Sequence, residues 1–256
     1  MMVIKESEFY NRLAELADRA RLRDMITSTF FLTPADQMAA QTWLDKRKMS
    51  YLMHGGYEGA ERKIILLLPD YLTPDQITIS LLEDAIAAIQ LKPKENDNQL
   101  THRDYLGSLL GLGINRDQTG DILIGDGQAT VLVCAKMAPL LLNELQSVGR
   151  QQVKAIRIDL SDLKAAVKNT EQIMVTASSL RLDKITAAGF SLSRSKASEL
   201  IRMGGVQVDW QVCQHPDAEV KIGAVISLRG HGRVCLIRDE GLSRKNRHRL
   251  ILERYL

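Results

Sequence analysis

The spacing of apolar and polar positions predicts two helices and a buried strand at the start of the chain. Residues 6–25 carry an apolar face at helical spacing, formed by Phe9, Leu13, Leu16 and Ala20. Thr33 and Pro34 suit the N-cap and first position of a second helix, whose expected inward-facing side chains are Met38, Thr42 and Trp43. Residues 63–68 then predict a buried strand that stops before Pro69.

The next stretch predicts a βαββαβ order. The expected elements are strand 77–82 (with helix as an alternative through Ile89), helix 101–112, strands 121–124 and 129–134 around a turn at 125–127, helix 136–146 and strand 153–158. This is the order of the ferredoxin-like fold, which RNA-recognition domains share. The fold alone does not name a function. The first and third strands carry no aromatic residue on which bases would stack, so any RNA contact must be made in another way.

The last third of the chain predicts a compact module. Helices are expected at 180–188 and 193–203, and short strands at 206–209, 225–229 and 234–237. A polar linker over 161–179, with a possible short strand at 173–176, precedes the module, and residues 243–249 are expected to be a basic tail. The fold class is therefore α+β, with domains at 1–74, 75–160 and 180–256.

Composition excludes several classes of protein. Hydrophobic residues make up 45% and charged residues 25% of the 256 residues, which is typical of globular proteins. The longest aliphatic run is too short to span a bilayer, the N-terminus has no secretory signal, and three scattered cysteines do not form a disulfide framework. We therefore expect a cytoplasmic protein without a membrane contact.

The charge distribution singles out the last module. The chain is net +3, but residues 181–256 hold 14 basic and 8 acidic residues, net +6, which leaves residues 1–180 at net −3. Such asymmetry indicates a polyanionic partner. Motifs for catalysis are missing: His102-Arg103-Asp104 is better explained as the first turn of a helix, and neither a nucleotide loop, a nucleophile–base pair nor metal-ligand spacing occurs. We expect no catalytic residue, metal, cofactor or small-molecule substrate.

Basic side chains and a helix start coincide in this module. Arg194 and Lys196 fall in the first turn of the second helix, where cations oppose the helix dipole. A bound phosphate would reverse that cost, because backbone N–H groups, Ser193 and Ser195 would converge on the same anion. Arg181 and Lys184 open the preceding helix and would flank the same groove. The alternative is a charged face that is merely solvated.

These residues resemble the S4 RNA-binding domain. The matching pieces are Arg181-Leu182-Asp183-Lys184, Leu192-Ser193-Arg194-Ser195-Lys196-Ala197, Ile201-Arg202-x-Gly204, Val206-x-Val208, Pro216 and Val220-x-x-Gly223-x-x-Ile226. The sequence departs from the pattern at Asp209-Trp210, where Asn-Gly is usual between the strands. Pseudouridine synthases, tyrosyl-tRNA synthetases and methyltransferases also carry S4 domains, but their catalytic motifs are absent.

Motifs upstream resemble the YlmH family, whose photosynthetic members are called photosystem II S4 domain proteins. They are His54-Gly55-Gly56-Tyr57-Glu58-Gly59-Ala60-Glu61-Arg62, residues 102–116 from His102-Arg103-Asp104 to Arg116, and Gly120-Asp121-Ile122. The resemblance implies a non-enzymatic protein that binds structured RNA (rRNA or tRNA) on the large ribosomal subunit in quality control, supporting C-terminal tailing of stalled chains. It also implies RNA contacts at Arg181 and Arg194.

Further basic residues are secondary candidates for RNA contact. They are Arg62, Lys63, Arg103, Arg116, Arg244, Lys245 and Arg247. Pairing of the first four with Glu58, Glu61 or Asp104 is an equally good interpretation, and the glycine loop at 54–62 is either a binding turn or a tight connection. Two rival functions remain: an RNA-modifying or tRNA-acting enzyme that uses S4 for delivery, and a protein-interaction scaffold.

Overall fold

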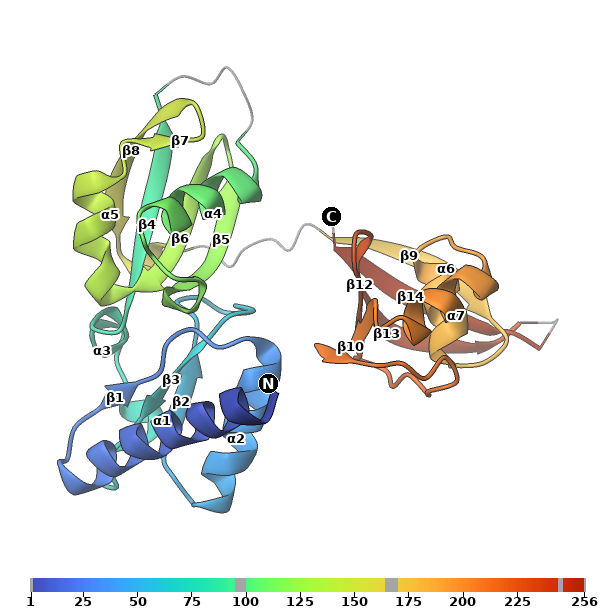
Figure 1. The fold of residues 1–256 in the computed structure, drawn as a ribbon, viewed down its shortest axis with the longest axis horizontal. Coiled ribbons are helices and arrows are strands. Elements are labelled where there is room, and N and C mark those ends of the chain that lie inside the picture. The colour runs from blue at the N-terminus through green and yellow to red at the C-terminus, as the bar shows by residue number, and fades with distance from the viewer. Residues whose placement is uncertain (1, 95–99, 164–169, 244–245, 256) are drawn as a thin grey trace. The chain divides into compact units, whose positions relative to one another are not determined.

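The computed structural model describes residues 2–94, 100–163, 170–243 and 246–255. The chain divides into two compact units, Met1–Ala166 and Val167–Leu256. In Figure 1 the first unit runs from blue to yellow-green and contains the N-terminal and central domains. The second unit, from yellow to red, contains the C-terminal domain. None of the described helices is long and apolar enough to cross a membrane.

The N-terminal domain packs two helices against a small sheet. Helix α1 (Met2–Leu22) and helix α2 (Pro34–Lys46) lie against strands β1 (Thr27–Ser28), β3 (Ile64–Leu67) and β2 (Tyr51–His54), in the order β1-β3-β2. The predicted Thr33 cap is confirmed, since its hydroxyl accepts a bond from the Asp36 N–H at 3.3 Å. Of the predicted inward positions of α2, Trp43 is confirmed, since it is half-buried and packs against the core. Met38 and Thr42 are wrong, because both are exposed, and Ala40 and Leu44 enter the core instead.

The central domain has the predicted strand and helix order. Strand β4 (Ile86–Pro93), helix α4 (His102–Gly111), the hairpin β5 (Thr119–Gly125) and β6 (Gln128–Cys134), helix α5 (Ala138–Glu144), and strands β7 (Ser147–Val148) and β8 (Gln151–Ile158) follow one another. The sheet order is β5-β6-β4-β8-β7, with antiparallel neighbours throughout. The ferredoxin-like arrangement is confirmed, with β7 added at one edge.

The first strand of this domain begins later than predicted. Residues 77–82 do not form a strand: a 3₁₀ turn at Pro74–Gln76 is followed by helix α3 (Ile79–Glu83), whose N-cap is Thr78. The strand itself is β4, which starts at Ile86. The Thr78 hydroxyl accepts the Leu81 N–H at 3.4 Å, and such a cap favours helix over strand immediately after it.

The two faces of the central sheet pack against different parts of the protein. Helices α4 and α5 cover one face, where they enclose a core that includes Ile89, Val131 and Tyr105. On the opposite face, Ile86 and Leu132 belong to a second cluster that also includes Phe31 and Ile64 of the N-terminal domain. The two domains of the first unit therefore share an apolar cluster.

The C-terminal unit is a long sheet with two helices. Strand β9 (Thr170–Ala177) precedes helices α6 (Leu182–Gly189) and α7 (Arg194–Arg202), strands β10 (Val206–Val208), β11 (Gln211–Val212) and β12 (Val225–Leu228), and the hairpin β13 (Gly232–Leu242) and β14 (His248–Tyr255). The sheet order is β11-β10-β12-β13-β14-β9. Leu182, Ile185 and Ile201 pack on it.

Two predictions about the ends of this unit are wrong. Residues 170–177 are not a linker, because all eight residues of β9 pair with β14; the possible strand at 173–176 is confirmed as part of β9. Residues 243–249 are not a tail, because β13 and β14 are joined through them and His248 pairs with Leu242. The partners in the β9–β14 pairing are 71 to 85 residues apart in sequence, from Ala177 with His248 to Thr170 with Tyr255, so local patterns do not predict it.

The unusual Asp209-Trp210 turn keeps the usual hairpin geometry. Both residues have positive φ, 48° and 63°, as a two-residue type I′ turn requires. The Asp209 carboxylate accepts the N–H of Val225 at 2.9 Å, and the Asp209 N–H donates to the Val225 carbonyl at 2.8 Å. These bonds tie the turn to β12 and offset the cost of a left-handed conformation without glycine.

Candidate nucleic-acid interface

Two arginines of the C-terminal unit converge on one buried aspartate. Arg181 is the N-cap of α6 and Arg194 is the first residue of α7. Arg181 donates from Nε to Oδ1 of Asp183 at 3.2 Å and from Nη2 to Oδ2 at 3.3 Å. Arg194 donates from Nε to the same Oδ2 at 2.9 Å. The predicted convergence of the two helix starts is thus confirmed.

The aspartate is the part of this arrangement that sequence reasoning missed. Its side chain is only 2% exposed, whereas those of Arg181 and Arg194 are 40% and 60% exposed. Burial alone raises the pKa of Asp183, but the hydrogen bonds and charges of the two arginines together outweigh burial and hold the pKa below its usual value. A signal was present in the Arg-Leu-Asp-Lys motif, whose third residue is an acid inside a basic segment.

The two helix N-termini differ in what they offer an anion. At α6, the N–H groups of Leu182 and Asp183 donate to the carbonyls of Ala218 and Pro216 at 2.8 and 2.9 Å, so this end is closed. At α7, the Ser193 hydroxyl caps the N–H of Lys196 at 3.2 Å. The N–H groups of Arg194 and Ser195 have no acceptor among the described residues, and both residues are exposed. Only the α7 start can therefore present backbone donors to a phosphate.

Secondary candidates aside, all but one of the other predicted contact residues in this unit lie at the starts of α6 and α7, near Arg181 and Arg194. Ser195 lies beside Ser193, with 3.1 Å between the hydroxyl oxygens. Lys196 forms an exposed ion pair with Glu199 at 3.1 Å, which is weak and easily exchanged for a phosphate. Lys184 is half-buried in the first turn of α6. Arg202 ends α7, about 12 Å along the axis from Arg194, so the structure does not bring it to the pair.

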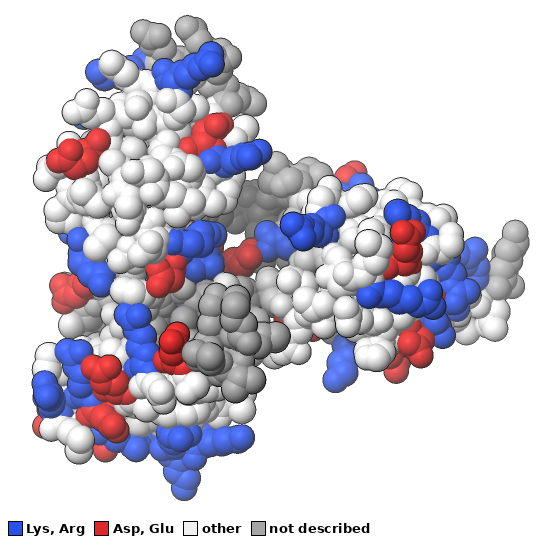
Figure 2. Space-filling view, viewed as in Figure 1, with Lys and Arg blue, Asp and Glu red and all other residues white. Residues whose placement is uncertain are grey.

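The arrangement suits the binding of phosphate groups. Asp183 takes both Arg181 bonds and the Arg194 Nε bond, and the two Nη atoms of Arg194 donate to no acceptor in the described part of the chain. A guanidinium held at its Nε edge presents its outer edge in a fixed orientation, which favours bidentate contacts with phosphate. Figure 2 shows that basic side chains outnumber acidic ones on the visible face of this unit.

Arg62 is not a surface contact, contrary to its prediction as a secondary RNA-binding residue. It is 8% exposed and donates from Nε to the Thr119 carbonyl at 2.9 Å and from Nη2 to the carbonyls of Phe31 and Arg116 at 2.9 and 3.1 Å. Burial and the nearby charge of Arg116 lower the pKa of Arg62. The side chain therefore joins the N-terminal and central domains. Its partners are main-chain carbonyls and not the predicted acidic residues.

The other secondary candidates belong to both units of the chain. Arg103 is exposed in the first turn of α4, and Lys63 is half-buried beside β3. Arg116 is exposed but donates to the carbonyls of Thr119 and Gly120 at 3.1 and 3.2 Å. Arg247 is exposed and donates to the Thr176 carbonyl at 3.0 Å. Arg244 and Lys245 lie outside the described residues.

The glycine loop at 54–62 is a tight connection. A Cβ atom on Gly55 would overlap Ala60 and the Arg62 carbonyl. The carboxylate of Asp121 in β5 holds the loop: it accepts the Tyr57 hydroxyl at 2.8 Å and the N–H groups of Glu61 and Arg62 at 2.7 and 3.1 Å. The Gly-Asp pair at 120–121 therefore has a structural role, because Asp121 holds the glycine loop in place.

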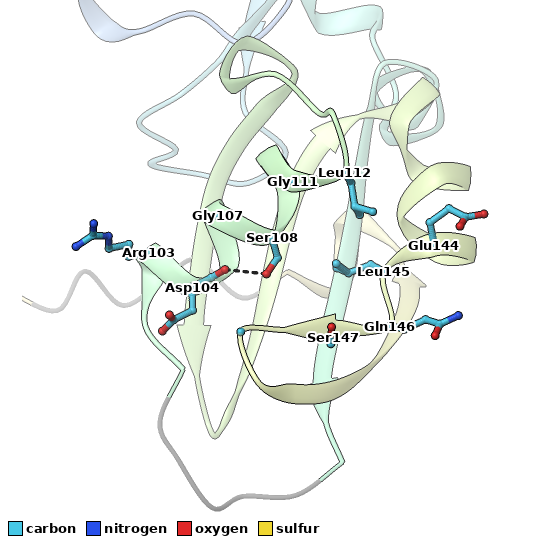
Figure 3. Close-up of a pocket in the computed structure, with 11 residues that line it drawn as sticks. Arg103, Asp104, Gly107, Ser108, Gly111, Leu112, Glu144, Leu145, Gln146 and Ser147 are labelled. Atoms are coloured by element: carbon cyan, nitrogen blue, oxygen red, sulfur yellow. Dashed lines mark hydrogen bonds between the residues drawn. The ribbon is translucent and has the colours of Figure 1, made fainter.

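The hollow beside α4 offers no converging catalytic groups. It measures about 610 Å³ and lies between α4 and the segment that follows α5. Figure 3 shows Arg103 and Asp104 on the opposite side from Glu144 and Gln146, with Ser108 bonded to the Asp104 carbonyl. The Asp104 carboxylate caps the helix by accepting the Thr101 N–H and hydroxyl at 2.8 and 2.7 Å. The interpretation of residues 102–104 as a helix first turn is confirmed.

Comparisons with known proteins agree with these features. The family described as "Putative RNA-binding domain in YlmH" matches residues 83–162, and the S4 domain matches residues 180–226. The chain is 32% identical over 245 residues to "Ribosome-associated protein quality control protein P2" of Bacillus subtilis (strain 168), covering 96% of this chain and 91% of that protein.

A solved structure shares the fold. "Cell division protein ylmH from Streptococcus pneumoniae" aligns with a TM-score of 0.53 at 19% identity, covering 63% of this chain and 96% of that one. At this identity the likeness concerns the fold alone. The identity to the Bacillus protein along nearly the whole chain, together with the two domain matches, shows that this protein belongs to the YlmH family.

Proposed function

We propose that this protein is a ribosome-associated RNA-binding factor that performs no chemistry. The observation that carries the proposal is the pair of exposed guanidinium groups held by buried Asp183 at the open N-terminus of α7. Such a site reads the position of phosphates on a folded RNA and needs no catalytic group. The printed name of the Bacillus subtilis relative supports ribosome association and a place in quality control.

The proposal extends to the RNA that is bound and to the cellular task. We place the contact on rRNA or tRNA at the large subunit in the cytoplasm, and the cellular task in C-terminal tailing of stalled chains. The site holds RNA by shape and phosphate position, so binding weakens steeply with salt.

Co-sedimentation with purified large ribosomal subunits tests this function. Arg194→Ala removes one guanidinium, while Arg181 still compensates Asp183. We expect weaker binding and a log–log salt slope that is shallower by about 0.7 to 0.9, the value for one phosphate contact on simpler nucleic acids. The matched control is Arg249→Ala, which removes the same charge from an exposed position on β14.

The outcomes distinguish binding at the proposed site from binding that depends on net charge alone. Normal binding by Arg194→Ala would contradict the proposed site. Equal losses in Arg194→Ala and Arg249→Ala would mean that net charge, not geometry, drives binding. Mass spectrometry of RNA incubated with the purified protein addresses chemistry: we expect unmodified RNA, and a modified nucleotide would overturn the non-enzymatic part of the proposal.

A further inference from the structure

The face of the central sheet away from α4 and α5 is only half covered. Ile86 and Ala88 of β4 lie in the apolar cluster shared with the N-terminal domain. Further along the same strand, Leu91 faces the helices, so alternation places Gln90 and Lys92 on the face that the N-terminal domain covers only at its other end. Gln90 is half-buried and Lys92 is exposed.

The uncovered half carries concentrated positive charge. On β8, Val153 faces the helices, so Lys154 lies on the open face, directly opposite Lys92 in the sheet register. Both lysines are exposed. Neither lysine side chain forms an ion pair or hydrogen bond with any residue that the structure describes. Like charges placed directly opposite each other destabilise a sheet, and a bound anion would remove that cost.

The charge continues beyond the end of β4. The Lys94 N–H donates to the Gln152 carbonyl at 2.9 Å, and its Nζ donates to the Gln152 side-chain oxygen at 2.9 Å. Arg150 is exposed in the turn between β7 and β8. Figure 2 shows basic side chains at the tip of the central domain where this turn lies. A row of cations along a strand and its turn matches an extended polyanion better than a single small anion.

We propose that this half-face, formed by Gln90, Lys92, Thr130, Lys154 and Ile156, binds the backbone of single-stranded RNA. Lys92 and Lys154 contact phosphates, and the amide of Gln90 and the hydroxyl of Thr130, which are opposite each other in the register, offer hydrogen bonds to sugars and phosphates. The face has no aromatic side chain in β4, β6 or β8, so recognition depends on charge and not on base stacking. This inference rests on the proposed RNA-binding function and adds a second contact surface to it.

The test is a salt titration of binding to short single-stranded oligo(U) and oligo(A), with full-length wild type and the double variant Lys92→Gln/Lys154→Gln. Removing two phosphate contacts should make the log–log salt slope shallower by about 1.4, at about 0.7 per contact on a single strand. Oligo(U) and oligo(A) should bind the wild type alike. The melting temperature should stay the same or rise, because a repulsive pair is removed. The single variants Lys92→Gln and Lys154→Gln, each with half the change in slope, provide a check on folding.

A matched control keeps the charge change constant. Arg23→Gln/Lys46→Gln removes two exposed cations from the same unit, near the ends of α1 and α2, and should leave the slope near wild type. An unchanged slope in the sheet variant, or an equal change in the control, would overturn the sheet proposal. Binding to large subunits distinguishes the two proposals. Suppose that Arg194→Ala loses subunit binding, while the sheet variant keeps both subunit binding and full oligonucleotide binding. The proposed function would then stand, and the assignment of this surface would be wrong. If wild type binds neither subunits nor RNA, the proposed function fails.

Discussion

Arg62 and Arg194 both stand beside several hydrogen-bond acceptors, but the acceptors differ in kind and in place. Arg62 is enclosed by three main-chain carbonyls from two segments of the first unit, and its Nε and Nη2 atoms donate to them. Arg194 bonds a buried carboxylate through Nε alone, and its side chain stays 60% exposed. An acceptor set that surrounds an arginine makes it structural, whereas a single acceptor behind it leaves its outer edge for a ligand.

The largest expected difference between the two regions is in stability. Arg62→Met should lower the free energy of unfolding by about 3 kcal/mol or more, since it removes three hydrogen bonds that a buried charged group donates, each worth about 1.5–3 kcal/mol. Chemical denaturation of the full-length protein measures this change. Near-wild-type stability of Arg62→Met would show that these carbonyls are solvated. Arg62 would then not be a structural residue, and it would not differ from Arg194 in this respect.

The packing next to Arg62 gives the next largest effect. A Cβ atom at Gly120 would lie 2.6 Å from the Phe31 ring, so Gly120→Ala should destabilise the protein by about 1–3 kcal/mol through overpacking. Gly107→Ala in α4 is the matched control, because its Cβ would meet no atom within 4 Å and a helical alanine gains about 0.5–1 kcal/mol over glycine. Thermal unfolding of both variants should show opposite shifts, and equal shifts would contradict the close domain contact.

The arginine pair should show itself in the pH dependence of stability. The folded pKa of Asp183 is lowered, so its stabilising contribution is present above the usual carboxyl pKa and is lost as pH falls through the lowered value. Asp183→Asn should therefore be less stable than wild type at neutral pH, with the difference shrinking in acid. Unfolding midpoints across that range measure it, and a constant difference would exclude ionised Asp183 as the cause.

The smallest expected change in stability belongs to Arg194. Its pair with Asp183 is exposed on the arginine side, and Arg181 remains to compensate the carboxylate, so Arg194→Ala should cost less than about 1 kcal/mol. Its effect should appear in RNA binding instead. A loss comparable to that of Arg62→Met would show that Arg194 is a structural residue.

Local signals in the sequence predicted much of this structure. Thr33, Thr101 and Ser193 mark helix starts where the structure has them, because a cap acts within three residues of itself. The same applies to the turn at 125–127 and to the basic helix start of the candidate site. The stretch after Ile77 misled, since residues 77–91 contain both a short helix and a strand, with only the polar residues Glu83 and Asp84 and the following Ala85 at the boundary between them.

Contacts between distant segments could not be predicted. Arg62 appeared to be a surface cation because its acceptors come from residues 31, 116 and 119. The segment 243–249 appeared to be a tail because the strand partners of its last two residues, His248 and Arg249, lie about 70 residues away in β9. Asp183 was visible as an acid in a basic motif, but its role required the loop after α6 to bring Arg194 to it. In each case the missing information is a tertiary contact and not a local preference.

Asp183→Asn offers the most direct measurement of the site, as its affinity for large ribosomal subunits at fixed salt. The substitution raises the net charge by one, so an interface that depends on charge alone would bind RNA more tightly. If Asp183 holds Arg181 and Arg194 in position, affinity falls despite the added positive charge, in a variant shown to be folded by its thermal transition. Equal or tighter binding would contradict the arrangement of two arginines on one buried carboxylate as the RNA contact.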